Sequence, residues 1–524
     1  MPYYIKEIGQ STNRKGFIGI MTLGAIVGAL AVGVLADKIG RKPTMVFSCI
    51  IFLVGSLFQT GADNGALMLS GRALTGFSVG IYSALVPLYQ SELAPKHLRG
   101  RLIAIYQYAI TLGIFCASWI AYGVADIQNG SSWRVAMGIQ MVPCLVLLIL
   151  ICFVPESPRY LMYRNHDCDA LRVLSKIHND DSTDHPGVYM EYVAIQQSIS
   201  HEKTFKNRNS YARVFSGSPE NNRRRLILGV LTQGFQQLTG INPILMFAPQ
   251  VLSAAGLSGL NVSLISNGIS ASVNMGATIP ALFLLDRFGR RTTMLVGAAG
   301  LCVCLIVMSI LSIIGHFVYG GDYATLTEPT TTQGVATVLG HVKQESIAFM
   351  VMQYIYVAIF AYTWGPLGWI YPTELYNQGI RAKALSLTSG IGWILTFAVF
   401  EFSTPMLVNI QGKSYIVYTC FCIAIIIAVY FFFPETKGKS LEEIDLIFSS
   451  DIGYFDVSAH HLQTAASTLA HMEKAQRKDA NRYPFQLGET GPHLPASLDN
   501  KSLPTCDEYK DIRHPTVAET EINQ

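Results

Sequence analysis

Long apolar stretches separated by short polar turns make up most of this chain of 524 residues. A helix needs about 20 predominantly apolar residues to cross the hydrocarbon core of a bilayer, so stretches of this length predict membrane-spanning helices. We predict eleven such spans, at residues 17–36, 44–60, 67–88, 101–122, 133–154, 226–252, 264–285, 292–316, 347–372, 383–405 and 415–433. The pattern therefore predicts an all-α polytopic membrane protein.

Two long polar segments divide the chain. Residues 155–225 are polar and basic with helical parts, and residues 449–524 have no hydrophobic periodicity, which is typical of a disordered tail. The predicted organisation is an N-terminal bundle at 1–154, an inter-bundle loop at 155–225, a C-terminal bundle at 226–448 and a disordered tail at 449–524.

A short polar hairpin between two spans occurs twice. Residues 33–42 read Gly-Val-Leu-Ala-Asp-Lys-Ile-Gly-Arg-Lys, and residues 282–291 read Leu-Phe-Leu-Leu-Asp-Arg-Phe-Gly-Arg-Arg. In each copy an apolar run ends at an aspartate, a glycine permits a tight turn, and two basic residues follow. Two further pairs recur in the same order: Glu92 with Arg99 as Glu374 with Arg381, and Pro155-Glu156 as Pro434-Glu435. This repetition indicates one duplicated unit.

The repeat also measures the first half. Two spans precede the second hairpin after Leu226, whereas one span precedes the first hairpin. We therefore predict that the first half lacks its first helix and that Met1 is an internal methionine of a longer product. A chain of this kind is expected to be impaired in coupled uptake.

The distribution of basic residues predicts the orientation. Short loops on the hairpin side hold eleven Lys and Arg, and those on the other side hold two. Because cytoplasmic loops carry an excess of positive charge, the hairpins and the C-terminal tail are expected in the cytoplasm. Asn129 and Asn261 begin glycosylation sequons on the outer side, but their short loops near the bilayer favour non-use.

Composition narrows the class further. Half of the residues are hydrophobic, 14% are charged and the mean hydropathy is +0.33, which leaves too few charges for a soluble surface of this size. A net charge of +3 implies no nucleic-acid partner. The ten cysteines have no metal or disulfide spacing, and no nucleophile, base and acid set, metal cluster or phosphate loop is present. We therefore expect neither an enzyme nor a bound metal or cofactor.

Several motifs resemble those of the sugar porter family of the major facilitator superfamily, in particular its fungal members, across about residues 1–448. The resemblance rests on residues 33–41, Gly71-Arg72 with the Gly76 and Gly80 spacing, Pro155-Glu156-Ser157-Pro158-Arg159, residues 236–242 (Gln-Gln-Leu-Thr-Gly-Ile-Asn), residues 286–291, Pro434-Glu435-Thr436-Lys437-Gly438 and residues 441–445. It implies the major facilitator fold, with two pseudo-symmetric bundles of six helices. Twelve helices in the family agree with the loss of one here.

A substrate site near the middle of the membrane is expected to contain uncharged hydrogen-bonding side chains, because polar groups that face lipid are costly. Amides donate and accept hydrogen bonds, and indole rings offer a stacking face to sugar C–H surfaces. The resemblance, together with Gly240 and Pro243 as a local helix break, implies a substrate site of Gln107, Gln236, Gln237, Asn242, Asn274, Trp369, Trp393 and Thr396. Packing between helices is the alternative role for any one of them.

Some positions depart from the family pattern. Met246 and Phe247 stand in place of a tyrosine pair, Gly392 in place of an asparagine before Trp393, and Thr396 in place of another asparagine. Pentoses, polyols, other hexoses and cyclic acids therefore stay open beside glucose. Pro366, Gly365 and Pro372 predict a flexible segment in the tenth family helix.

The acids and arginines of the repeat are expected to form an inner gate. If the halves pack as pseudo-symmetric bundles, Arg–carboxylate pairs can bridge them and close one side of the cavity. The predicted gate contains Asp37, Arg41, Glu92, Arg99, Glu156, Arg159, Asp286, Arg290, Glu374, Arg381 and Glu435. The alternative is that these residues follow the positive-inside rule and cap helix ends.

Arg72 lies within a predicted span, where a guanidinium requires a counter-charge. It resembles the arginine that, in proton-coupled members, pairs with an aspartate on the first helix, and this implies a coupling role. The leading hypothesis is a secondary transporter that moves a monosaccharide-like substrate by alternating access, with proton symport in the complete protein. The alternatives are a sugar sensor of the same fold that signals through its tail, and a facilitative or impaired truncated transporter. We expect a monomer in the plasma membrane.

Overall fold

The structure is a computed structural model of the chain. The structure describes residues 14–94, 99–125, 127, 131–177, 188, 191–193, 195–196, 199, 210–217, 221–245, 260–314, 344–377, 379–437, 444 and 448. All regular structure in this part of the chain is helical. The predicted all-α class is therefore confirmed, and the predictions for the first helix, Asn129, the pair Met246 and Phe247, and the tail lie outside the described residues.

The chain forms two compact units. The first takes in Met1–Val154 and Arg208–Val457, and the second begins at Pro155. The second unit contains the amphipathic helices α8 (Pro158–Tyr163) and α9 (Asp167–Ile177). Their apolar side chains, among them Met162 of α8 and Leu171 and Leu174 of α9, form a small core.

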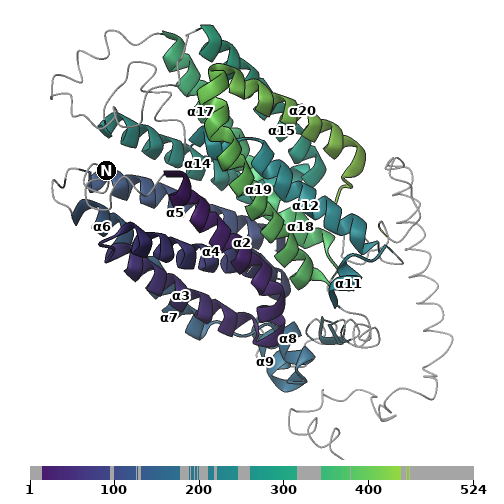
Figure 1. Ribbon diagram of the computed structural model, residues 1–524. Coiled ribbons are helices and arrows are strands. Elements are labelled where there is room, and N and C mark those ends of the chain that lie inside the picture. The colour runs from purple at the N-terminus through teal and green to yellow at the C-terminus, as the bar shows by residue number, and fades with distance from the viewer. Residues whose placement is uncertain are drawn as a thin grey trace, which may run out of the picture. The chain divides into compact units, whose positions relative to one another are not determined.

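The first unit contains the long helices, in two halves that lie side by side (Figure 1). The N-terminal half consists of α2 (Arg14–Lys38), α3 (Arg41–Thr60), α4 (Gly65–Leu93), α5 (Arg99–Gly123), α6 (Ser131–Gly138) and α7 (Met141–Phe153). The C-terminal half consists of α11 (Ser210–Val214), α12 (Asn222–Leu238), α14 (Leu260–Phe288), α15 (Arg290–Ile314), α17 (Gln344–Tyr362), α18 (Trp364–Leu375), α19 (Arg381–Ile410), the 3-10 turn η3 (Gln411–Lys413) and α20 (Ser414–Phe432).

Each of the eleven predicted spans coincides with helix in the described residues. Nine stretches in this part of the chain are long and apolar enough to cross a membrane, by length and composition. The other two predicted spans correspond to α4 and α12. α12 has 17 residues, and α4 buries a face of small and hydroxyl residues, such as Thr75 and Ser78, which lowers its hydropathy.

Small residues explain the position of α4. A Cβ on Gly76 or Gly80 would collide with the backbone of α2, and a Cβ on Gly24 or Gly28 would collide with the backbone of α4. Glycines four residues apart let two helices approach closely, as in other small-xxx-small contacts in membranes. The Gly76 and Gly80 spacing therefore serves the contact between α2 and α4.

Each hairpin turns at a glycine that an L side chain would strain. Gly40 has φ 108° and Gly289 has φ 84°. The first turn connects α2 to α3, and the second connects α14 to α15. In each following helix a threonine donates to the carbonyl oxygen of the turn glycine: Thr44 Oγ1 to Gly40 O at 2.5 Å and Thr293 Oγ1 to Gly289 O at 2.6 Å. The two hairpins thus share backbone geometry as well as sequence. We call the end of the first unit that carries these turns the hairpin end.

Candidate functional site

Four amide side chains lie in α12 and just after it, where the helix is interrupted. We call Gln233, Gln236, Gln237 and Asn242 the amide cluster. Helix α12 ends at Leu238, Gly240 has φ 88°, and residues 241–245 are helical again. The predicted break at Gly240 is therefore observed. It lets Asn242 Nδ2 donate to Gln237 Oε1 at 2.6 Å. One turn of helix separates this pair from Gln233, which lies on the same face of α12 as Gln236 and Gln237.

Gln236 connects the amide cluster to α18. Its Nε2 donates to the carbonyl oxygens of Trp364 at 3.1 Å and Gly365 at 3.0 Å. Gly365 also faces Gln107 of α5, because a Cβ at this glycine would lie 3.1 Å from Gln107 Nε2. The three helices α5, α12 and α18 therefore meet at Gly365. Thr363 interrupts the helix between α17 and α18 (φ −109°, ψ −80°), three residues before Pro366.

Trp369 joins the two halves. Its indole Nε1 donates to Gln107 Oε1 at 3.1 Å, and its ring packs edge-on to Tyr106 with the centroids 5.5 Å apart. Both Trp369 and Gln107 were predicted substrate residues, and the structure brings them together across the boundary between the halves.

Trp393 makes a second contact of the same kind. Its Nε1 donates to Ser83 Oγ of α4 at 3.0 Å. Thr396, one turn further along α19, donates to Gly392 O at 2.8 Å within its own helix. Asn274 of α14 is 7% exposed, and its side-chain amide makes no hydrogen bond to another described residue. Thr396 and Asn274 are therefore not bonded to the amide cluster in the described part of the chain.

Two buried residues of this region were not predicted. Gln233 Nε2 donates to Gly368 O at 2.6 Å, and its Oε1 lies 3.0 Å from the place of a Cβ on Gly392. Gln233 therefore occupies the space left by Gly392. Its position one turn before Gln236 on the same helix face could have identified it from the sequence. Ser83 offered no comparable signal, because serines on buried helix faces are common.

The arginines of the hairpins pair with carboxylates inside their own halves. Arg41 of α3 holds Glu92 of α4 in a bidentate pair, with Nε–Oε2 at 3.0 Å and Nη2–Oε1 at 2.8 Å. Arg290 of α15 holds Glu374 of α18 in the same manner, with Nη2–Oε1 at 2.9 Å. Bidentate geometry makes these contacts strong. Each pair ties two helices of one half together.

Glu435 caps the start of α15. Its carboxylate accepts the backbone N–H groups of Arg290 at 2.7 Å and Arg291 at 3.0 Å, and those of Thr436 and Lys437 at 3.1 and 3.0 Å. A carboxylate at a helix N-terminus satisfies free N–H groups and complements the helix dipole. Thr436 Oγ1 donates to Glu374 Oε2 at 2.6 Å, so the cap and the Arg290–Glu374 pair are connected.

The other predicted gate residues have different surroundings. Arg381 is 3% exposed and donates Nε and Nη2 to Tyr376 O at 3.2 and 3.0 Å. Glu156 and Arg159 belong to the second unit, where Glu156 Oε1 accepts the N–H of Ser157 at 2.9 Å. The side chains of Arg99 and Asp286 lie outside what the structure describes.

An ion pair between described residues crosses between the halves at the hairpin end. Lys383 Nζ of α19 lies 3.3 Å from Asp37 Oδ2 of α2, and Ser386 Oγ donates to Ala29 O at 2.8 Å one turn further along. Lys383 Nζ also lies 5.9 Å from the ring centroid of Tyr211 in α11. Burial, and secondly the charge of Asp37, raise the pKa of the Tyr211 phenol, which favours the neutral form.

Arg72 contacts two methionines. Its Nη1 lies 3.6 Å from Met21 Sδ of α2, and its Nη2 lies 3.5 Å from Met137 Sδ of α6. The half-buried guanidinium therefore sits where α2, α4 and α6 meet.

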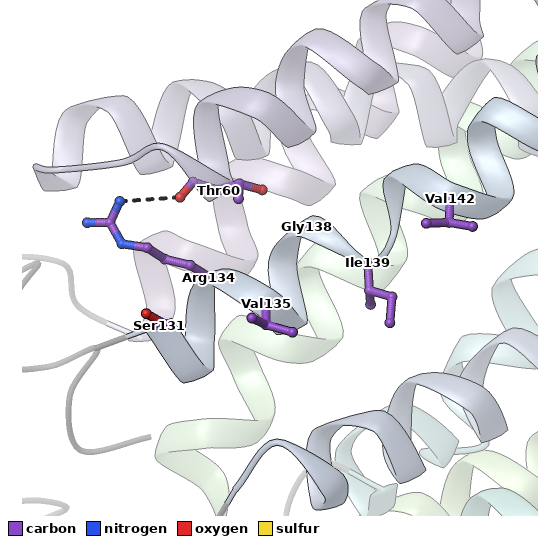
Figure 2. A pocket seen from close by; sticks show the side chains of 7 residues that line it. All are labelled: Thr60, Ser131, Arg134, Val135, Gly138, Ile139 and Val142. Carbon is purple, nitrogen blue, oxygen red and sulfur yellow. Dashed lines mark hydrogen bonds between the residues drawn. The ribbon is translucent and has the colours of Figure 1, made fainter. Parts of the chain in front are cut away.

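A separate, mainly apolar hollow lies at the end of α3 opposite Arg41. Figure 2 shows its lining residues Thr60, Ser131, Arg134, Val135, Gly138, Ile139 and Val142. Arg134 Nη1 donates to Thr60 O at 3.5 Å, and its Nη2 pairs with Asp63 at 3.1 Å. None of the predicted substrate residues lines this hollow.

Comparisons with known proteins agree with these features. The family model described as "Sugar (and other) transporter" matches residues 4–448. A glucose transporter of Aspergillus flavus is 33% identical over 461 residues (85% of this chain, 84% of the relative), and a high-affinity glucose transporter of Kluyveromyces lactis is 31% identical over 451 residues (84% and 78%). Among solved structures, the proton:xylose symporter XylE bound to 6-bromo-6-deoxy-D-glucose aligns with a TM-score of 0.70 and 24% identity, covering 85% of this chain and 93% of that one.

Proposed function

Because the chain belongs to the sugar (and other) transporter family, we propose that it is a secondary transporter that moves a monosaccharide or a related polyhydroxy compound by alternating access. The likeness to XylE shows the major facilitator fold, in which two halves move about a central site. The relatives named glucose transporters favour a sugar as the substrate.

The observation that carries this proposal is the uncharged polar cluster between the halves. Gln107, Gln236, Gln237 and Asn242 offer donors and acceptors, and Trp369 and Trp393 add indole rings. Sugar hydroxyls need both donors and acceptors, and sugar C–H faces stack on aromatic rings. Such a cluster binds a neutral polyhydroxy compound better than an ion.

Proton symport is the proposed mode of coupling, with Arg72 as the coupling residue. A guanidinium in a membrane-spanning helix is costly and is retained where it serves transport. Its position between α2, α4 and α6 means that a change in the contacts of Arg72 would alter the packing of the N-terminal half.

The hairpin end is proposed to be the inner gate. Arg41–Glu92 and Arg290–Glu374 make each half rigid there, and Asp37–Lys383 joins the halves. In this arrangement opening toward the cytoplasm separates α2 from α19 without breaking the bidentate pairs. The excess of basic residues at this end supports a cytoplasmic position for it and for the C-terminus, in a monomer of the plasma membrane.

Uptake of labelled sugars by cells that lack their own sugar transporters tests the proposal. We expect saturable uptake of glucose or xylose. A fall in this uptake when a protonophore collapses the proton gradient would support symport, and uptake that the protonophore leaves unchanged would favour a facilitative transporter. Gln236→Ala should reduce uptake at low sugar concentration about tenfold or more, because it removes donors and acceptors from the site.

Gln59→Ala is the matched control, because Gln59 is also buried and its Nε2 also donates to a backbone carbonyl, that of Gly71 at 3.2 Å. Uptake by this variant, corrected for protein amount, should stay near that of the wild type. Equal losses in both variants would contradict the site. Sugar-dependent signalling without uptake would favour the sensor.

A further inference from the structure

Ser83 is held in one hydrogen-bonding role by its own helix. Its side chain is 3% exposed, and its hydroxyl donates to Gly80 O at 2.7 Å. A serine hydroxyl has one proton and two lone pairs, so the remaining capacity of Ser83 is that of an acceptor. The indole Nε1 of Trp393, which can only donate, lies 3.0 Å from this oxygen.

Trp393 is thereby held from two directions. On its backbone side, Gly392 leaves room for Gln233, which is itself bonded to Gly368 O of α18. On its side-chain side, the N–H bonds to Ser83 of the other half. The indole of Trp369 is held similarly, with Gly368 leaving room for Gln236 and with Gln107 accepting its N–H. Each tryptophan therefore follows a glycine that receives an α12 glutamine, and each donates to the N-terminal half.

We propose that Ser83 is a positioning residue for sugar recognition, which fixes the indole of Trp393 by accepting its N–H. This inference rests on the proposed function. With the N–H used by Ser83, Trp393 offers the substrate a ring face and no donor. A fixed ring face complements the flat C–H surface of a pyranose and is of little use to an open-chain polyol. We therefore expect Ser83 to contribute to the preference for a ring-form sugar over an open-chain polyol.

The test compares Ser83→Ala, which removes the acceptor, with Ser83→Thr, which keeps a hydroxyl. In the full-length protein we expect Ser83→Ala to raise the KM for D-glucose or D-xylose uptake about fivefold, the effect of losing one net hydrogen bond. The maximal rate per transporter should change less than the KM. The preference for these sugars over D-sorbitol or xylitol should narrow, and Ser83→Thr should restore both values.

Ser91→Ala is the matched control. Ser91 lies on the same helix, is 1% exposed and donates to Leu88 O at 2.7 Å, and it has no bond to the other half within the described residues. Its KM should equal that of the wild type. In a Trp393→Phe background, Ser83→Ala should add no further rise in KM, because the group that it positions is gone.

The outcomes separate the two proposals. A wild-type chain that transports neither sugar sinks the proposed function itself. An unchanged KM in Ser83→Ala overturns the positioning role and leaves the transporter function standing. The same holds if uptake falls equally in Ser83→Ala and Ser91→Ala and the amount of protein accounts for the whole fall. A further KM rise for Ser83→Ala in the Trp393→Phe background overturns it as well.

Discussion

Two separate features of position 289 require glycine there. Its φ of 84° is a region that L residues adopt only with strain, and a Cβ there would lie 2.7 Å from Glu435 Oε2. Any side chain would therefore displace the carboxylate that caps α15. The same hairpin position in the first half, Gly40, has the first requirement with φ 108°.

Gly289→Ala should destabilise the protein by about 1–2 kcal/mol from backbone strain, plus the loss of the Glu435 cap. We expect a lower melting temperature in detergent and reduced transport. Gly276→Ala is the control, because a Cβ at this α14 glycine meets nothing within 4 Å. Alanine in an open helical position should leave the melting temperature unchanged or raise it. Equal melting of the two variants would refute the argument.

The chemistry of the site could be predicted from the sequence better than its partners. The amides of α12 lie in one stretch of chain, so their shared face follows from helical spacing. Ser83 and Trp393 are 310 residues apart, and only the packing of α4 against α19 brings them together. No pattern along the chain records that contact.

At the scale of elements, α2 and α19 form the seam between the halves at the hairpin end. A Cβ on Gly33 would lie 2.7 Å from Tyr211 Oη and 3.1 Å from Ser386 Oγ, so α2, α11 and α19 converge there. Lys383 and Asp37 add the charged contact, with side chains 17% and 36% exposed. Water screens a pair of this exposure, so it contributes at most about 1 kcal/mol to closure.

Lys383→Gln should therefore weaken inner closure by up to about fivefold. In vesicles, the half-saturation constants measured from the two sides should shift relative to one another. Lys437→Gln is the control, because Lys437 lies at the same end and donates to Arg287 O at 2.6 Å within its own half. If both variants keep the wild-type ratio of the two constants, Asp37–Lys383 is not part of the gate.

The repeat of hairpins predicted the two matched charge sets, but their pairing follows from how each half packs. Arg41 and Arg290 were expected to bridge the halves, and both pair inside one half because α3 lies on α4 and α15 lies near α18. Arg381 turns to Tyr376 O, which it can reach five residues away. Which residue crosses the seam was not visible in the spacing, since Lys383 is absent from the repeated pairs.

For the whole molecule, the halves touch along a second seam between α5 and α14. Trp119 Nε1 donates to Ser272 Oγ at 3.2 Å, and its ring packs against Gly268. The halves therefore touch through α5 and α14 as well as through α2 and α19. The class and the spans were predictable because bilayer thickness imposes the length of each apolar stretch. The seams depend on side-chain shape.

The proposed orientation has a direct test at the two ends of α3. Asp63 is exposed at one end, and Lys38 lies beside the hairpin at the other. A membrane-impermeant maleimide should label Asp63→Cys in intact cells and Lys38→Cys only after permeabilisation. The wild-type chain measures the background of native cysteines. The reverse labelling pattern would invert the topology.

The cap at Glu435 has a consequence for sequence drift. All four groups that it accepts on residues 290, 291, 436 and 437 are main-chain N–H groups. Every amino acid except proline has this N–H group. Substitutions at these four positions can therefore change the charge around the cap without removing these four bonds. The cap therefore depends on the side chain of Glu435 and on Gly289, which leaves room for it.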